Sequence, residues 1–192
     1  MKRFLIFAFI LGSVYSSAQH KVTFSSQNYL GLLVGEQGSK SQLQTINGAK
    51  FKSWFAGLGA GIDWYYRRSI PLFMSLDKDF LKKGNRNFYF TADGGVNFPW
   101  KDDETYKEQG YEITSTPAGL YWAAGLGYKI GIGKKNDALL LQLGYSYKHI
   151  RENVKNTWYP IYSDPELLPL QNLTDRFDYY LNTFSLKIGW KF

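Results

Sequence analysis

The sequence predicts an all-β protein: a closed, antiparallel, up-and-down transmembrane β-barrel of about eight strands that follows a cleaved signal peptide. Three observations predict this fold. Large apolar residues alternate with small or polar residues at a period of two, which places one set on each face of a strand. Several of these runs have about 12 to 14 residues, enough to cross a bilayer at a tilt. Finally, 15 Tyr, 14 Phe and 6 Trp accompany 19 Gly, a combination that suits tightly packed sheets better than helices.

The first 18 residues have the features of a secretory signal peptide. Lys2 and Arg3 precede an apolar run at residues 4–14, and small residues end at Ala18 before Gln19. The apolar run has about 11 residues, whereas a transmembrane helix needs about 20. We therefore expect cleavage after Ala18, which leaves residues 19–192 as one barrel domain.

The strands can be followed along the chain by their alternation. In the third, Trp54, Leu58 and Ile62 share one face, and glycines fill most of the other. Aromatic residues near both ends of the apolar faces are typical of the two lipid–water boundaries. A soluble carrier would instead place its larger apolar residues inside the barrel. The eight strands are expected at residues 28–36, 41–47, 54–66, 69–79, 87–100, 120–133, 139–148 and 180–192.

The connections predict the orientation of the barrel. Short connections at residues 47–53, 82–86 and 133–137 alternate with a second set that includes two long segments, residues 101–117 and 153–178. Bacterial barrels have short periplasmic turns and longer outer loops. Both long segments are therefore expected to be outer loops, and both termini are expected in the periplasm.

The last strand carries a distinctive set of alternating residues that ends the chain on an aromatic: Phe184, Leu186, Ile188, Trp190 and Phe192. With this strand, the chain resembles the small OmpA/OmpX-type outer-membrane barrels of Gram-negative bacteria. It is also similar in style to the outer membrane protein β-barrel domain families of Bacteroidota, and the resemblance covers roughly residues 28–192. In such families a terminal aromatic strand is read by the barrel-assembly machinery, so the resemblance implies that these five residues form the assembly signal. It implies no catalytic or ligand-binding residues, because these barrels serve many unrelated functions.

Charged residues at inward positions predict a polar network in the lumen. An eight-stranded barrel has an interior only wide enough to be filled by side chains. Opposite charges there are expected to pair, because isolated buried charges are costly. A proton or ion path is the alternative. The residues expected to form this network are Asp63, Asp77, Asp93, Lys129 and Lys187.

Basic residues at the expected outer rim form a candidate site for lipopolysaccharide phosphate groups. Arg67, Arg68, Lys148 and Arg151 fall at this rim in the predicted topology. Guanidinium groups suit phosphate oxygens. Ordinary anchoring at the interface is the simpler interpretation, and both can hold together. Outer-membrane lipid and lipopolysaccharide are thus the expected partners, and a surface partner stays unidentified.

Several kinds of function are disfavoured by composition. The chain has no cysteine, which excludes thiolate metal sites and thiol nucleophiles. Its formal net charge of +7 falls by two when Lys2 and Arg3 are removed, and nucleic acid is an unlikely partner after export. His149 is the only histidine after His20, and no Ser/His/Asp spacing accompanies it. We therefore expect no catalytic residues, no cofactor and no metal site, and we interpret the acidic segment 102–112 as a solvated loop.

Three functions are consistent with these features. The first is a non-enzymatic role in envelope structure or surface interaction through the two long outer loops. The second is the passage or binding of a small apolar molecule beneath the apolar stretch at residues 158–170, which either folds back over the barrel mouth or meets a partner. The third is a lipid-modifying enzyme that uses His149 at the outer rim.

Overall fold

The computed structural model describes residues 22–100, 111–132, 137–156 and 174–192, and every regular element in these ranges is a β-strand. No helix long and apolar enough to cross a membrane is found in the described part of the chain. The strands are β1 (Thr23–Gly35), β2 (Gly38–Phe51), β3 (Trp54–Asp63), β4 (Ser69–Lys83), β5 (Arg86–Pro99), β6 (Tyr111–Ser115), β7 (Gly119–Gly131), β8 (Ala138–Asn156) and β9 (Thr174–Lys191).

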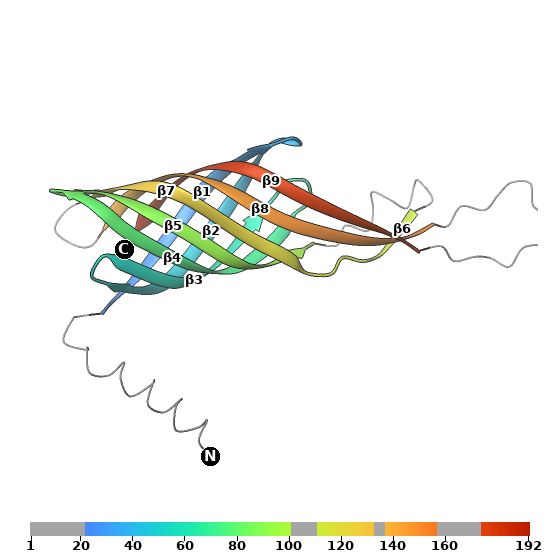
Figure 1. Ribbon diagram of the computed structural model, residues 1–192, viewed down its shortest axis with the longest axis horizontal. Coiled ribbons are helices and arrows are strands. Elements are labelled where there is room, and N and C mark those ends of the chain that lie inside the picture. Colours follow the sequence, from blue (N-terminus) through green and yellow to red (C-terminus); the bar gives the residue numbers. More distant parts are fainter. Residues whose placement is uncertain (1–21, 101–110, 133–136, 157–173) are drawn as a thin grey trace, which may run out of the picture.

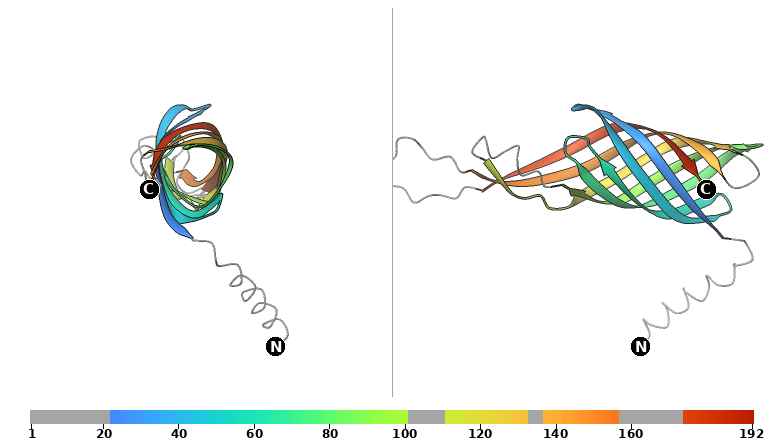
Figure 2. Two further views of the ribbon diagram at one scale, coloured as in Figure 1. Left: turned by 90° about the vertical axis from the view of Figure 1, so that its left-hand side faces the viewer. Right: turned by 180° about the vertical axis from the view of Figure 1, so that it is seen from behind.

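Eight of these strands close into an antiparallel barrel, which confirms the predicted fold class. The sheet order is β6-β8-β7-β5-β4-β3-β2-β1-β9, and an additional pairing of β8 with β9 completes the ring. The first and last barrel strands pair from Gln27↔Lys191 to Gly35↔Thr183. Figure 2 shows the resulting closed ring when the barrel is viewed from one end. Because the ring is closed, each barrel strand pairs with a neighbour on both sides. A sheet in an apolar phase requires this, since its backbone N–H and C=O groups cannot bond to water there.

A three-stranded ribbon continues beyond the barrel at one end. It consists of β6, residues 150–156 of β8 and residues 174–179 of β9, and we call it the extension. Strand β7 begins at Gly119 and does not reach into the extension. There β6 pairs with β8 instead, for example at Ile113↔Val154. Figure 1 shows the extension projecting from the barrel on the side of β6. Because β6 only prolongs the edge that β7 forms, the barrel itself has eight strands.

The two ends of the barrel differ in their connections. At the end that holds the start of β1 and the C-terminus, which we call the terminal end, tight turns join β2 to β3 at Lys52 and β4 to β5 at Gly84 (Figure 2). Both residues have positive φ, 54° and 59°, and glycine adopts this conformation without strain. The extension lies at the opposite end, together with the long connections. The grouping of connections predicted from the sequence therefore matches the arrangement of the ends.

The outer surface of the barrel is apolar on most strands, while β2 presents mainly small and polar residues. Leu58, Met74 and Phe184 leave 68%, 70% and 71% of their surface exposed. Exposed tryptophans lie toward both ends, for example Trp54 and Trp190 near the terminal end. An apolar surface of this extent is stable when another apolar phase covers it, and aromatic rings at its two borders are typical of membrane barrels.

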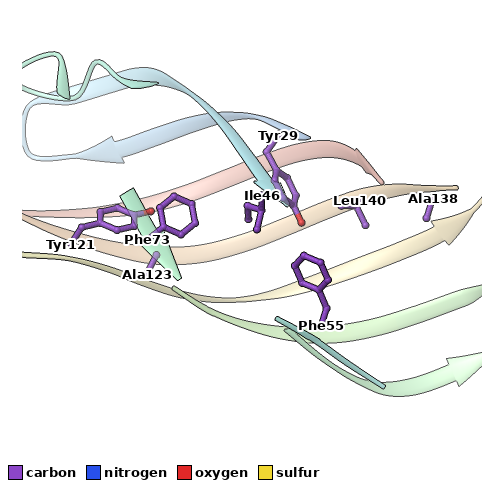
Figure 3. Close-up of a cluster of buried hydrophobic side chains, with 8 residues drawn as sticks. All are labelled: Tyr29, Ile46, Phe55, Phe73, Tyr121, Ala123, Ala138 and Leu140. Atoms are coloured by element: carbon purple, nitrogen blue, oxygen red, sulfur yellow. The ribbon is translucent and has the colours of Figure 1, made fainter. Parts of the chain in front are cut away.

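The interior contains an aromatic layer that alternates with glycines. Figure 3 shows Phe73 beside Tyr121, with Phe55, Ile46 and Tyr29 farther along the lumen. The Phe73 and Tyr121 ring centroids are 5.3 Å apart. A side chain at Gly59 would overlap the Phe73 ring, and one at Gly127 would overlap the Tyr89 ring. The inner glycines therefore provide the space in which the inner aromatic rings pack.

Several predicted boundaries differ from the structure. The predicted loop 153–178 contains strand at residues 153–156 and 174–178, and the predicted loop 101–117 contains β6. These pieces pair with one another, although their exposed, charged faces obscure the alternation seen in the barrel. Strands β1 and β2 are also longer than predicted. The prediction missed the ends of these strands because the residues there are mostly polar. The predicted signal peptide, the acidic segment up to Gly110 and the apolar stretch 158–170 lie outside the described residues.

Candidate functional site

The most distinctive feature of the molecule is a network of side chains that crosses the lumen. At the terminal end, Lys129 Nζ lies 2.9 Å from Asp79 Oδ1 and 3.4 Å from Asp77 Oδ2. Its ammonium group also lies 4.0 Å from the centre of the Tyr89 ring. On the far side of the lumen, Gln27 donates a hydrogen bond of 2.9 Å to Asp77. The carboxylate of Asp77, which is 2% exposed, is thus held by partners from two strands.

Tyrosine and glutamine side chains continue the network through the middle of the barrel. The Tyr29 hydroxyl donates to Gln27 at 2.6 Å and lies 3.2 Å from the Tyr89 hydroxyl. Farther along, Lys187 donates to Gln44 at 2.8 Å, and Gln44 donates to Tyr121 at 3.1 Å. These contacts join β1 to β5, β9 to β2 and β2 to β7 across the lumen.

A third group of charges lies toward the extension. Lys148 Nζ is 3.0 Å from Asp63 Oδ2 and also donates to the Ser69 hydroxyl at 3.1 Å. Just beyond it, Arg67 Nε is 3.1 Å from Glu152 Oε1, and both side chains are buried. Burial raises the pKa of the Glu152 carboxyl, and the neighbouring Arg67 guanidinium opposes this rise.

An apolar cluster covers this polar group at the extension end. It consists of Leu33, Tyr65, Ile150 and Leu181, with Tyr66 and Tyr179 packed against it. The rings of Tyr66 and Tyr179 lie 4.8 Å apart. Side chains from all eight barrel strands therefore make contacts at several levels of the lumen, from the terminal end to this cluster.

All five residues expected in the lumen network lie inside the barrel, although the pairing is more specific than the sequence could predict. Asp63, Asp77, Asp93, Lys129 and Lys187 are each at most 6% exposed. Lys129 pairs with Asp77, whereas Asp63 pairs with Lys148 and Lys187 bonds Gln44. The Asp93 Oδ1 atom has no hydrogen-bond partner within the described residues. The tyrosine and glutamine members were missed, because an inward tyrosine cannot be recognised from alternation alone.

The rim residues proposed from the sequence separate into two groups. Arg67 and Lys148 point into the lumen and engage Glu152 and Asp63, so their side chains do not lie on the outer face that the expected phosphate contact requires. Lys148 points inward because it lies two residues after the inward Ser146 on β8, and Arg67, in the connection between β3 and β4, is also buried. Arg68 does face outward, and its guanidinium lies 4.5 Å from the centre of the Trp100 ring.

The outward face of the extension carries a compact group of charges around Asp178. Arg151 Nε and His149 Nε2 both lie 2.8 Å from Asp178 Oδ1, and Arg176 Nε lies 3.0 Å from Oδ2. Hydrogen bonding by Arg151, with further help from His149 and Arg176, lowers the pKa of the Asp178 carboxyl to about 2. The His149 ring also stacks on Tyr180 at 5.1 Å. We call these residues the Asp178 cluster.

The outward residues of the proposed assembly signal form one continuous apolar row. Phe184, Leu186, Ile188, Trp190 and Phe192 are all exposed on the outside of β9. Backbone hydrogen bonds in both directions between Phe192 and Ser26 attach the end of the chain to β1. The geometry required for a closing strand is therefore present, while recognition by the assembly machinery stays a prediction.

Comparison with known proteins gives a similarity of fold. No family model matches the chain, and no curated protein matches it. The crystal structure of Neisserial surface protein A (NspA) aligns with a TM-score of 0.51 at 11% identity, over 89% of this chain and 97% of that one. The outer membrane protein OprG from Pseudomonas aeruginosa aligns with a TM-score of 0.49 at 12% identity, over 90% and 96%. The likeness to NspA shows that the chain has the fold of a small eight-stranded outer-membrane barrel. Membership of the Bacteroidota families stays a prediction.

Proposed function

We propose that this protein is an outer-membrane barrel without an open pore, and that it serves a non-enzymatic role in envelope structure or surface interaction. The observation that carries the proposal is the network across the lumen. Ion pairs and hydrogen bonds such as Lys148–Asp63 and Gln27–Asp77 join opposite walls at successive levels. A continuous water column would require these pairs to separate.

The proposed orientation places both termini in the periplasm and the extension outside the cell. It is supported by the tight turns at the terminal end and the long connections at the other end, the asymmetry typical of bacterial barrels. The apolar outer surface and its aromatic borders support placement in the outer membrane. In this orientation the extension is the part of the barrel that meets other molecules at the cell surface.

At the outer boundary we propose contact with lipopolysaccharide phosphate groups through Arg68 and Arg151, with Arg176 added from the structure. All three are on the outside, and their side chains are partly or largely exposed. Arginine can present two parallel N–H donors to phosphate oxygens. Arg67 and Lys148 are left out of this proposal because their charges are engaged in the lumen.

Two alternatives are less well supported. Passage of a small apolar molecule would require an apolar route, whereas the lumen is crossed by charged and hydrogen-bonded groups. A lipid-modifying enzyme would require His149 to activate a nucleophile. Its Nε2 atom instead faces Asp178, a carboxylate that two arginines already hold. This arrangement suits electrostatic cross-linking of β8 and β9 better than general-base catalysis.

Single-channel recording tests the sealed lumen. The purified barrel should give no stable conductance in planar bilayers, with a large porin in the same bilayer as the positive control. Reproducible large conductance steps would overturn the proposal and favour passage. An altered lipid profile of the membrane after deletion of the protein, restored by wild type but not by His149→Ala, would favour the enzyme.

Lipopolysaccharide contact is tested separately by binding to immobilised lipopolysaccharide. The double variant Arg68→Ala/Arg176→Ala should bind about tenfold more weakly than wild type. Arg86→Ala, which removes an exposed arginine at the terminal end, is the matched control and should bind normally. Equal loss in the control would show that the interaction depends on overall charge rather than on the outer boundary.

A further inference from the structure

A small cavity opens at the terminal end, next to the Lys129 end of the lumen network. It has a volume of about 130 Å³ and lies between the ends of β2, β4, β5, β7 and β9. Four lysines line its described wall, together with two asparagines. We call it the lysine pocket, and its polar members are Lys50, Lys82, Lys129, Lys191, Asn85, Asn87 and Asp137.

The ion pairs around the lysine pocket leave positive charge in excess. Asp79 is shared, with Lys50 Nζ at 3.2 Å and Lys129 Nζ at 2.9 Å. Neither Lys82 nor Lys191 forms an ion pair or a hydrogen bond within the described residues. Asp137 is the one acidic residue on the described wall. More ammonium groups than carboxylates therefore face this cavity.

Lys191 makes this excess chemically significant. It points inward at the end of β9 and is only 5% exposed, whereas lysines are almost never fully buried without a partner. Its cationic neighbours Lys50 and Lys129 are partly offset by Asp79 and Asp77, and Lys191 itself has no ion-pair partner within the described residues, so its ammonium is available to an anion. A cavity of this volume could hold about four waters, at about 30 Å³ each, and is therefore large enough for one small oxyanion.

We propose that the lysine pocket binds a phosphate group. A phosphate offers several acceptor oxygens, so it can satisfy Lys191 and Lys82 at the same time. Lysine is a common phosphate ligand that acts as a point charge. In the proposed orientation the pocket faces the periplasm at the level of the inner leaflet. The phosphate can come from that leaflet's phospholipid headgroups or from a free phosphate in solution.

Isothermal titration calorimetry of the refolded full-length barrel with inorganic phosphate tests the site directly. Wild type should show saturable binding that weakens as salt is added. Lys82→Gln should weaken binding about fivefold, because it removes one exposed charge from the wall. Lys83→Gln is the matched control, since it removes the neighbouring exposed lysine that does not line the cavity, and its affinity should be unchanged.

Two further variants keep the test independent of folding defects. Lys191→Gln should weaken binding more than Lys82→Gln does, and circular dichroism in detergent reports whether it has folded. Asp137→Asn removes the acidic residue from the wall and should strengthen binding about threefold. A variant that gains affinity cannot be explained by misfolding.

The source of the phosphate is resolved by native mass spectrometry with two lipids. Retention of phosphatidylglycerol but not diacylglycerol by wild type, and its loss in Lys82→Gln and Lys191→Gln, would identify a lipid headgroup. Binding of inorganic phosphate without lipid retention would identify a free phosphate. The proposal is overturned if wild type binds neither probe, or if Lys82→Gln and Lys83→Gln bind alike.

Discussion

Replacing Lys129 with methionine would test whether the lumen network stabilises the barrel. Methionine has a similar length and no charge, so Lys129→Met removes the ammonium group while it preserves most of the packing. The change leaves the carboxylates of Asp77 and Asp79 without their shared partner. Removing one member of a buried ion pair costs about 3–5 kcal/mol.

The structure places the expected loss at the lower end of that range. Asp79 keeps Lys50 at 3.2 Å, and Asp77 keeps the hydrogen bond from Gln27 at 2.9 Å. The contact of the ammonium group with the Tyr89 ring is also lost, at about 1 kcal/mol. We therefore expect the free energy of unfolding to fall by about 3 kcal/mol.

Urea unfolding of the barrel in lipid vesicles, followed by tryptophan fluorescence, measures this loss. The double variant Lys129→Met/Asp77→Asn should recover part of it, because it removes one of the stranded charges. Lys83→Met, on the exposed surface at the same end, should change stability by less than about 0.5 kcal/mol. If Lys129→Met and Lys83→Met are equally stable, the lumen is well hydrated and the proposed network does not hold the barrel closed.

Three further predictions concern packing, assembly and pH. Gly127→Ala should destabilise the barrel by about 1–3 kcal/mol in the same urea assay, because the new methyl group overlaps the Tyr89 ring; unchanged stability would show that this ring can move aside. Deletion of residues 189–192 should remove the pairs that join β9 to the start of β1 and leave the protein protease-sensitive in cells, whereas a folded barrel at normal abundance would contradict the closing role of this segment. The pKa of Asp178 is about 2 in the folded protein and ordinarily about 3.9, so its stabilisation of the extension is complete above pH 4 and is lost as the pH falls toward 2. The protection of the extension from hydrogen exchange, taken relative to the intrinsic exchange rate at each pH, should fall over this interval in wild type, and in Asp178→Asn it should already be low at pH 5.

The barrel strands were predictable because their two faces meet chemically different surroundings. Outward residues such as Leu58 and Leu126 contact the apolar phase, while inward Gly59 and Gly127 make room for aromatic rings. This contrast repeats on most strands and gives a clear period of two. The strand count and the pairing of first with last then follow from the need to close the sheet.

The extension was not predictable, because its strands lack this contrast between an apolar outer face and an inner face of small residues. Beyond the barrel, the outward face of β8 and β9 carries the Asp178 cluster in place of apolar side chains. Only a few buried residues, such as Ile150 and Val154, keep the alternation, which is too short to distinguish a strand from a loop. The partners within the lumen were also hidden, because pairs such as Lys148 and Asp63 depend on how strands distant in sequence face one another.

A lumen closed by paired charges separates the chemistry of the two ends of the barrel. Nothing bound in the lysine pocket can pass to the extension unless contacts such as Lys129–Asp77 and Lys148–Asp63 open. The two ends also attract different groups. At the terminal end, Lys82 and Lys191 line a cavity without an ion-pair partner among the described residues, whereas the extension holds its arginines on an outward face around Asp178. Because the charges are arranged locally at each end, a substitution at one end should leave binding at the other end unchanged.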